Sequence, residues 1–313
     1  MDVSIVIPLY NKQPYINRCL QSVLKQKYQH FEIIVVNDGS TDDGASEVEH
    51  FQDQRIRLLS QPNRGVAVAR NVGVEAARNE MVFFLDADDT WQPELLQEVV
   101  KLIEIYPALG VYACGTTKIY ANGQRQSETV AANAYEVNSF ILRDYFQSFV
   151  DIGGSPFSSS SFCVRRTTFN LAGKYTAGVR LTEDSDLWVR LALISKFALL
   201  PRSLADYYVE TADNTRTDPQ TSPYEVIGTL EKLLASEKMP SHLRGSARKL
   251  LAMQKNTQIK RLILLGKTRA ALRGFLTTVT WMLRPTETAV LLLAALMPQA
   301  LFRRAYARKT STR

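Results

Sequence analysis

The sequence predicts an α/β fold: a mostly parallel central sheet flanked by helices, followed by an all-helical C-terminal extension. Short β-branched apolar runs alternate with helically spaced apolar residues over roughly the first 110 residues, and only helical patterns follow residue 224. Polar residues come directly after three of the apolar runs. With 45% apolar and 22% charged residues, the 313-residue chain has an ordinary globular composition, which excludes the disordered and low-complexity classes.

The first half of the chain alternates between strand-like and helix-like patterns. Buried strands are predicted by short, almost wholly apolar runs at residues 3–9, 31–36, 56–59 and 81–85. Helices are predicted by apolar residues every three or four positions at residues 14–28, 42–51, 65–78 and 93–106. Because neighbouring parallel strands need a crossover connection, this alternation favours a parallel sheet covered on both faces.

The second half mixes the two patterns and then changes character. Strands are predicted at residues 110–120, 159–165 and 197–200, and a helix at residues 185–195. A stretch rich in Thr, Asp and Pro at residues 213–223 is typical of a linker. We therefore expect a globular domain at residues 1–212, with halves 1–110 and 111–212, and a basic helical extension at residues 224–313.

The charges are divided unevenly along the chain. Residues 1–224 hold 21 Lys/Arg against 27 Asp/Glu, whereas residues 225–313 hold 17 against 4. Within the basic part, residues 286–306 combine an apolar run with Arg303-Arg304, a pattern suited to lying in an anionic membrane interface. Two interpretations remain open: peripheral contact with an anionic membrane, or a helical cap on the domain with solvated charges.

Several locations and chemistries fit the sequence poorly. The three cysteines are too few and too scattered for a disulfide framework or a zinc site, which favours a reducing compartment. No basic region precedes the first apolar run, and residues 288–302 fall short of the ~20 residues of a spanning helix. We expect a cytoplasmic protein, at the inner face of the cytoplasmic membrane if the tail binds lipid. The basic tail lacks interleaved aromatic residues, so no nucleic-acid partner is expected.

Asp86-Ala87-Asp88 follows the fourth predicted strand. In an extended segment, alternate side chains share a face, so these two carboxylates are expected to lie about 6–7 Å apart at Cα. Oxygen ligands with this spacing suit Mg²⁺ or Mn²⁺ bridging to a diphosphate. The alternative is a solvated acidic turn that caps the next helix.

Asp38 and Arg70 are two further candidates. A carboxylate at the end of a buried strand needs a partner, and a nucleobase N–H would supply one for Asp38. The other interpretation of residues 37–42 is a tight turn ending in a helix cap. Arg64 or Arg70 could hold a phosphate or a base, although surface ion pairs are the commoner fate of arginine.

Glu183-Asp184 precedes the helix predicted at residues 185–195. A positioned carboxylate can take the proton of an acceptor hydroxyl, which is the work of a general base. The alternative is a helix start whose acidic residues match the helix dipole.

Taken in order, five segments resemble bacterial-type family 2 glycosyltransferases, which have the GT-A fold. They are residues 4–11, 37–42, 63–73, 86–89 and 183–184. The resemblance covers roughly residues 1–210 and makes residues 1–212 the catalytic domain. It implies inverting, metal-dependent enzymes that use nucleotide-diphosphate sugars, commonly UDP-linked. One departure is Asn37, where many relatives have a further Asp.

The resemblance also implies roles for individual residues. It assigns Asp184 as the catalytic base with Glu183 beside it, and Asp88 as the ligand of Mn²⁺ or Mg²⁺. It assigns the nucleotide-sugar site to Pro8, Tyr10, Asn11, Asp38, Arg70, Asp86 and Ala87, with Asp38 facing the base and Arg70 as a nucleotide-side contact.

The function expected from this resemblance is transfer of a single sugar to a hydroxyl of a saccharide or lipid-linked saccharide. No Gln-x-x-Arg-Trp motif is present, which disfavours a processive synthase. The main alternative is a catalytically inactive GT-A protein that binds nucleotide sugars. A nucleotidyltransferase would normally have a Gly-rich phosphate loop near the first strand, and Tyr10-Asn11-Lys12-Gln13 is not one.

Overall fold

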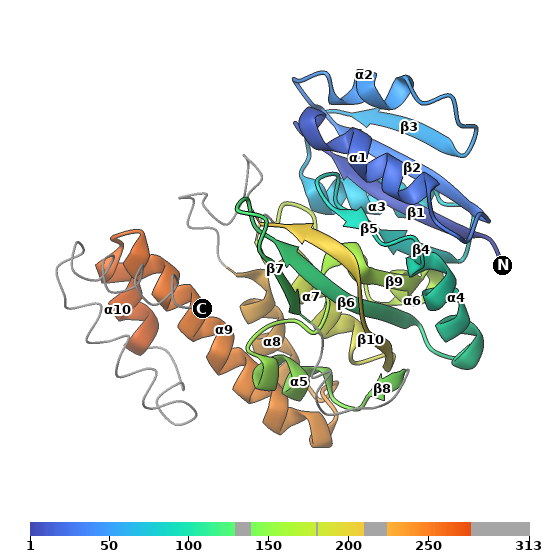
Figure 1. Cartoon of the computed structure of the whole chain (residues 1–313). Helices are drawn as coiled ribbons and strands as arrows, with labels where there is room; N and C mark the ends of the chain where they lie inside the picture. Colours follow the sequence, from blue (N-terminus) through green and yellow to red (C-terminus); the bar gives the residue numbers. More distant parts are fainter. Residues whose placement is uncertain (129–138, 180, 210–223, 277–313) are drawn as a thin grey trace. The chain divides into compact units, whose positions relative to one another are not determined.

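The computed structural model describes residues 1–128, 139–179, 181–209 and 224–276 (Figure 1). The chain divides into two units, Met1–Thr215 and Arg216–Arg313. The division falls inside the segment at residues 213–223 that the sequence predicts as a linker.

The first unit contains one mixed sheet and the helices packed on it. Its strands are β1 (Val3–Leu9), β2 (Phe31–Asp38), β3 (Ile56–Gln61), β4 (Met81–Phe84), β5 (Thr90–Trp91), β6 (Val111–Ile119), β7 (Arg125–Glu128), β8 (Phe140–Leu142), β9 (Phe162–Arg165) and β10 (Phe197–Tyr208). Its helices are α1 (Gln13–Leu24), α2 (Gly44–Glu49), α3 (Val66–Ala76), α4 (Leu95–Ile105), α5 (Tyr145–Ile152), the 3₁₀ turn η1 (Ser159–Ser161), α6 (Arg166–Leu171) and α7 (Glu183–Leu191).

The strands follow the order β3-β2-β1-β4-β9-β6-β10-β5 across the sheet, with β7 beside β6 and β8 beside β10 (Figure 1). The first four of these strands are mutually parallel, which confirms the prediction made from the alternating pattern. Beyond β4 the sheet becomes mixed, because β9 is antiparallel to both β4 and β6. The carboxyl ends of β1, β2 and β4 therefore lie at one edge, where ligands of such sheets bind.

The two faces of the sheet are covered by different helices, as the two-residue period of a strand requires. Ile5 and Ile7 of β1 belong to a core that also contains buried residues of α1, α2 and α4. Val6 points the other way and packs against α3, where a Cβ on Gly73 would lie 2.2 Å from its Cγ1. Glycine at position 73 thus lets α3 approach β1 closely.

Aromatic side chains fill the second face beyond α3. Phe84 of β4 stacks on Phe162 of β9, with ring centroids 5.6 Å apart, and also contacts Phe169 of α6. Phe157 continues this cluster and meets Trp188 of α7 at 4.7 Å. This packing holds α7, and therefore its first turn, against the sheet.

The structure differs from the predicted elements mainly after residue 85. Strand β10 runs through Tyr208, well past the predicted end at residue 200, with register shifts after Leu200 where Pro201 interrupts the apolar run. Residues 159–161 form a 3₁₀ turn instead of the start of a strand, and α7 begins two residues before the predicted helix. The sequence does not predict β5, β7, β8, α5 and α6, because each is at most eight residues long and such short segments leave a weak local signal.

The second unit is helical throughout its described residues. It contains α8 (Glu225–Ala235), the 3₁₀ turn η3 (Ser241–Leu243), α9 (Arg244–Leu264) and α10 (Thr268–Leu276). Ile259 and Ile263 of α9 pack with Ala271 and Phe275 of α10 in a small core. The run at residues 286–306 that suggested membrane contact lies outside the described residues. Within them, no helix is both long and apolar enough to cross a membrane.

Candidate active site

The loops after β1 and β2 are joined by hydrogen bonds at one edge of the sheet. The side-chain oxygen of Asn11 accepts a hydrogen bond from the backbone N–H of Thr41 at 2.8 Å. In the other direction, Asp42 Oδ2 accepts one from the backbone N–H of Gln13, also at 2.8 Å. These reciprocal bonds hold the segment after Tyr10 beside the turn at residues 37–42.

Left-handed backbone occurs at the turns of this edge. Asn11 has φ 50°, which asparagine tolerates better than most residues, and Gly39 has φ 73°. A Cβ at position 39 would lie 2.7 Å from the backbone nitrogen of Asn63. Glycine is therefore required at position 39 by both conformation and space, which brings the loop after β3 close to the end of β2.

Asp38, at the end of β2, is 3% exposed and organises the loop that leads into α3. Its Oδ1 accepts hydrogen bonds from Gln61 Nε2 at 2.6 Å and from the Arg64 N–H at 2.9 Å. Its Oδ2 accepts one from the Gly65 N–H at 2.7 Å. The partners expected for this buried carboxylate thus come from the protein itself. Contact with a nucleobase stays a prediction that rests on the family resemblance.

Arg70 of α3 draws three predicted site carboxylates together. Its Nη2 donates to Asp86 Oδ1 at 2.7 Å, just after β4. Its Nη1 donates to Asp184 Oδ1 at 2.9 Å and, at a longer 3.3 Å, to Glu183 Oε1. We call these four residues the Arg70 cluster. Residues from three separate parts of the chain therefore meet on one guanidinium.

The first turn of α7 presents two of these carboxylates. Thr182, the residue before the helix, has φ 66°, a strained value for a β-branched side chain. Asp186 is fully buried and pairs with Arg190 at 2.7 Å, so it has a structural role within the helix. Glu183 and Asp184 lie outside that pair and contact Arg70 instead, which goes beyond what a helix start alone requires.

Burial and neighbouring charges shift the pKa values of the groups in the Arg70 cluster. Burial raises the pKa of Glu183 to about 8, with the nearby Asp184 adding to the shift and Arg70 opposing it. Burial also raises the pKa of Asp86, again against the effect of Arg70. Although burial alone would lower the pKa of Arg70, Asp184 and Asp86 outweigh it, so the guanidinium stays charged. One cation cannot neutralise three carboxylates, and near neutral pH Glu183 carries a proton.

Asp88 lies near the Arg70 cluster but has its own partner. Its Oδ2 is 2.9 Å from Lys12 Nζ, and Arg18 Nη2 donates to its backbone carbonyl at 2.6 Å. The described residues include no group of three or more His, Cys, Asp or Glu side chains that could hold a metal ion. Mg²⁺ is often bound by one or two carboxylates together with substrate phosphates, so Asp88 fits a metal that arrives with a diphosphate.

Asp89 is a residue whose role the sequence did not reveal. It is 1% exposed, and its Oδ2 accepts a hydrogen bond from Ser160 Oγ at 2.5 Å. Its Oδ1 accepts one from the Tyr208 N–H at 3.1 Å. Burial, with contributions from Asp88 and Asp86, raises its pKa well above the usual range. Asp89 thus links the loop at residues 86–89 to β10. The only sign of this role in the sequence is that Asp89 falls outside the alternation of Asp86 and Asp88.

The remaining predicted residues differ in accessibility. Tyr10 is 45% exposed, so its ring is available to a flat ligand such as a nucleobase. Pro8 and Ala87 are buried, and their side chains are not accessible from solvent. Tyr175 was not predicted, yet its ring centroid lies 5.2 Å from the Arg70 guanidinium carbon.

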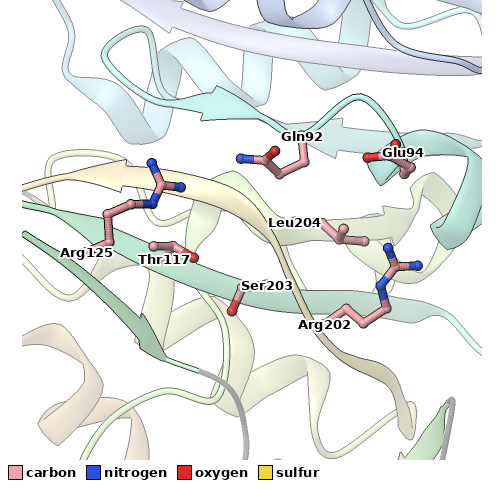
Figure 2. Close-up of a pocket in the computed structure, with 7 residues that line it drawn as sticks. All are labelled: Gln92, Glu94, Thr117, Arg125, Arg202, Ser203 and Leu204. Carbon is pink, nitrogen blue, oxygen red and sulfur yellow. The ribbon is translucent and has the colours of Figure 1, made fainter.

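A separate hollow of about 430 Å³ lies elsewhere on the first unit (Figure 2). It is lined by Gln92, Glu94, Thr117, Arg125, Arg202, Ser203 and Leu204. Figure 2 shows its two arginines at opposite ends, and each has an acidic partner: Arg125 pairs with Asp206 and Arg202 with Glu98. None of the lining residues is a predicted site residue.

Replacing Glu183 by Gln tests whether the pKa of Glu183 is raised in the folded protein. A carboxyl whose pKa is higher in the folded state binds more protons there, so stability falls as pH rises from about 4.5 to about 8. We expect Glu183→Gln to become more stable than the wild type as pH rises through this window, with the difference vanishing at the acidic end. Thermal melting across pH measures this. Glu75→Gln, on the exposed side of α3, controls for loss of one charge, and parallel wild-type and Glu183→Gln profiles would contradict the assignment.

Comparisons with known proteins identify glycosyltransferases as relatives of this chain. The family model described as Glycosyl transferase family 2 matches residues 4–171, more than half of the chain. The glycosyltransferase GlyG of Streptococcus pneumoniae is 37% identical over 234 residues, which cover 69% of this chain and 73% of GlyG. An uncharacterized glycosyltransferase of Nostoc, alr2836, is 40% identical over 114 residues, covering 36% of this chain and 35% of its own.

Other matches differ in how much of each protein they cover. The chain spans about a third of the length of alr2836 and of EpsJ from Bacillus subtilis, an uncharacterized glycosyltransferase 38% identical over 118 residues. Among solved structures, TarS 1–349 of S. aureus in complex with UDP-GlcNAc superposes with a TM-score of 0.68 at 17% identity, over 99% of this chain and 92% of that one. This likeness confirms the GT-A fold. The family match and the GlyG alignment establish that the chain belongs to glycosyltransferase family 2.

Proposed function

We propose that the protein transfers a single sugar, with inversion, from a UDP-linked donor to a hydroxyl of a saccharide or lipid-linked saccharide. The observation that carries this proposal is the meeting of Asp184 and Asp86 on Arg70, at 2.9 and 2.7 Å. A base for the acceptor and a carboxylate on the donor side are thereby brought to one place. Family membership supports glycosyl transfer, and the UDP-GlcNAc complex of the TarS structure supports UDP as the nucleotide.

The proposed reaction uses these groups as follows. Tyr10 and Asp38 face the nucleoside, and Asp86 faces the ribose and the donor sugar. Asp184 takes the proton of the acceptor hydroxyl as that oxygen attacks the anomeric carbon. The bond between this carbon and the diphosphate oxygen breaks on the opposite side, so the anomeric configuration inverts. Glu183, which carries a proton near neutral pH, leaves Asp184 as the base of the pair.

Asp88 is the proposed ligand of Mn²⁺ or Mg²⁺, in company with the donor diphosphate. Bound there, the ion would neutralise charge on the departing nucleotide diphosphate. Lys12 Nζ, at 2.9 Å, now supplies the positive charge beside Asp88. Lys12 therefore has to share this carboxylate or move from it when the ion and the donor bind.

Calorimetric titration with UDP tests the donor site. We expect binding that Mn²⁺ or Mg²⁺ strengthens, that a chelator weakens, and that in Asp88→Asn loses its dependence on the ion, because one protein ligand is gone. Asp2→Asn, exposed at the N-terminus, controls for the lost charge. If UDP does not bind, dTDP and GDP are titrated next. Failure of all three nucleotides with metal present would contradict the proposed donor class.

Turnover assays test the proposal that Asp184 is the catalytic base. A panel of UDP-sugars, assayed by product mass and UDP release, identifies the donor. We expect Asp184→Asn to lower kcat by about 100-fold or more, the usual effect of removing a general base, while UDP affinity is retained. A wild-type protein that binds UDP but turns over no donor in the panel would favour the inactive, nucleotide-sugar-binding alternative.

We further propose that the basic helices make peripheral contact with anionic membrane. Helix α9 carries six Lys and Arg residues and no acidic one. Because such charge is attracted to anionic headgroups, we expect the full chain to sediment with phosphatidylglycerol vesicles and not with phosphatidylcholine vesicles. A chain ending before Pro285 is expected to sediment less. Equal and negligible sedimentation of both chains would rule the contact out.

A further inference from the structure

Arg70 is less exposed to solvent than the carboxylates that it contacts. Its side chain is 3% exposed, whereas those of Asp86 and Asp184 are 29% and 23% exposed. A ligand that enters from solvent therefore meets the carboxylates before it meets the guanidinium. This order is the reverse of what a nucleotide-contacting arginine would require.

Three of the five N–H groups of Arg70 have carboxylate partners within the protein. Nη1 serves both Asp184 and Glu183, and Nη2 serves Asp86. Nε is buried and has no hydrogen-bond partner among the described residues, and the ring of Tyr175 lies nearby. Because the guanidinium is planar and rigid, it sets the directions from which its carboxylates approach.

Both helices that meet at the Arg70 cluster are fixed to the sheet. Helix α3, which carries Arg70, is fixed at its start by the hydrogen bond from the Gly65 N–H to Asp38 and along its length by the close approach of Gly73 to β1. Helix α7 is held by the aromatic cluster and by Asp186, which accepts hydrogen bonds from Thr176 and Arg190. Between these two fixed helices, the hydrogen bond from Arg70 orients the Asp184 side chain, 114 residues later in the chain.

We propose that Arg70 is a positioning residue for the base Asp184: it holds this carboxylate at a fixed separation from Asp86 and does not contact the nucleotide. The inference rests on the proposed function, since it presumes that Asp184 is the base. It differs from the nucleotide-side role that the family resemblance implies for Arg70. Its consequence is that Arg70 contributes to kcat through Asp184 and affects donor binding only through Asp86, without a nucleotide contact of its own.

Arg70→Lys is the central variant, because lysine keeps the charge but cannot bond three carboxylates in the planar geometry of a guanidinium. UDP affinity is measured by calorimetry, and kcat and donor KM by UDP release from the UDP-sugar that the wild type consumes. We expect kcat to fall by about 10- to 100-fold, the range for a misplaced catalytic group, and the accompanying change in UDP affinity and donor KM, which acts only through Asp86, to be smaller than the loss in kcat.

A double-mutant cycle separates action through Asp184 from independent action. Arg70→Lys is measured both in the wild type and in Asp184→Asn, using the residual turnover of the latter. If Arg70 acts through the base, its effect on kcat shrinks to about twofold once the base is gone. If the two losses multiply, Arg70 acts independently and the inference is overturned.

Matched variants guard against a purely structural effect. Arg57→Lys changes an arginine that is only partly buried, paired with Glu32 at 2.9 Å on the far end of β2 and β3, and is expected to leave kcat and KM unchanged. Arg70→Gln removes the charge and is expected to lower kcat further. Because loss of a buried counter-charge can unfold a protein, circular dichroism checks the fold of each variant. Arg70→Lys carries the test if Arg70→Gln does not fold.

The outcomes distinguish the inference from the proposed function. A more than tenfold loss of UDP affinity in Arg70→Lys, with kcat retained, makes Arg70 a nucleotide contact and overturns the inference alone. A wild-type protein that releases no UDP from any donor overturns both. A kcat-specific loss that disappears in the Asp184→Asn background supports the positioning role.

Discussion

The site depends on one interaction, the contact of a single buried guanidinium with three carboxylates. Removing Arg70 would leave Asp86, Glu183 and Asp184 facing one another in a poorly solvated place, which is costly for carboxylates. Much of the surrounding structure keeps this guanidinium in place. Asp38 fixes the loop before α3, Gly73 allows α3 to approach β1, and the aromatic cluster holds α7 against the sheet.

The same interaction distinguishes two neighbouring acids, of which the family resemblance assigns Asp184 as the base. Glu183 and Asp184 are adjacent in the first turn of α7, and both contact Arg70 Nη1. The Asp184 contact is shorter, 2.9 against 3.3 Å, and burial raises the pKa of Glu183 to about 8. A pair in which one member holds the proton is suited to base catalysis by the other.

Most of the parallel half of the fold could be predicted, because strands buried on both faces leave strong apolar runs, as in residues 3–9 and 31–36. Asp38, Asp86 and Asp88 are predicted as site residues because they lie at or just after the ends of those strands, whereas the prediction of Arg70, Glu183 and Asp184 rests on the loop and helix-start patterns and on the family resemblance. Their partners are not predicted. Two of the three hydrogen bonds to Asp38 come from backbone N–H groups, which nearly every residue has, so the sequence carries no sign of them. Arg70 and Asp184 are 114 residues apart, and Lys12 and Asp88 also lie far apart in the sequence. Short elements such as β5 are held by tertiary pairing and leave no local signal.

The strand order determines whether the two sequence halves of the first unit can be exchanged independently. The sequence suggests two halves joined near residue 110, but strands of the two halves pair with each other. β9, from the second half, lies between β4 and β6, and β5, from the first half, pairs with β10. Each half thus completes the sheet of the other, and the Arg70 cluster takes residues from both. The halves are therefore not interchangeable modules. Exchanging one half for that of a relative would break strand pairing within the shared sheet, whereas loops at its edge can be changed without disturbing that pairing.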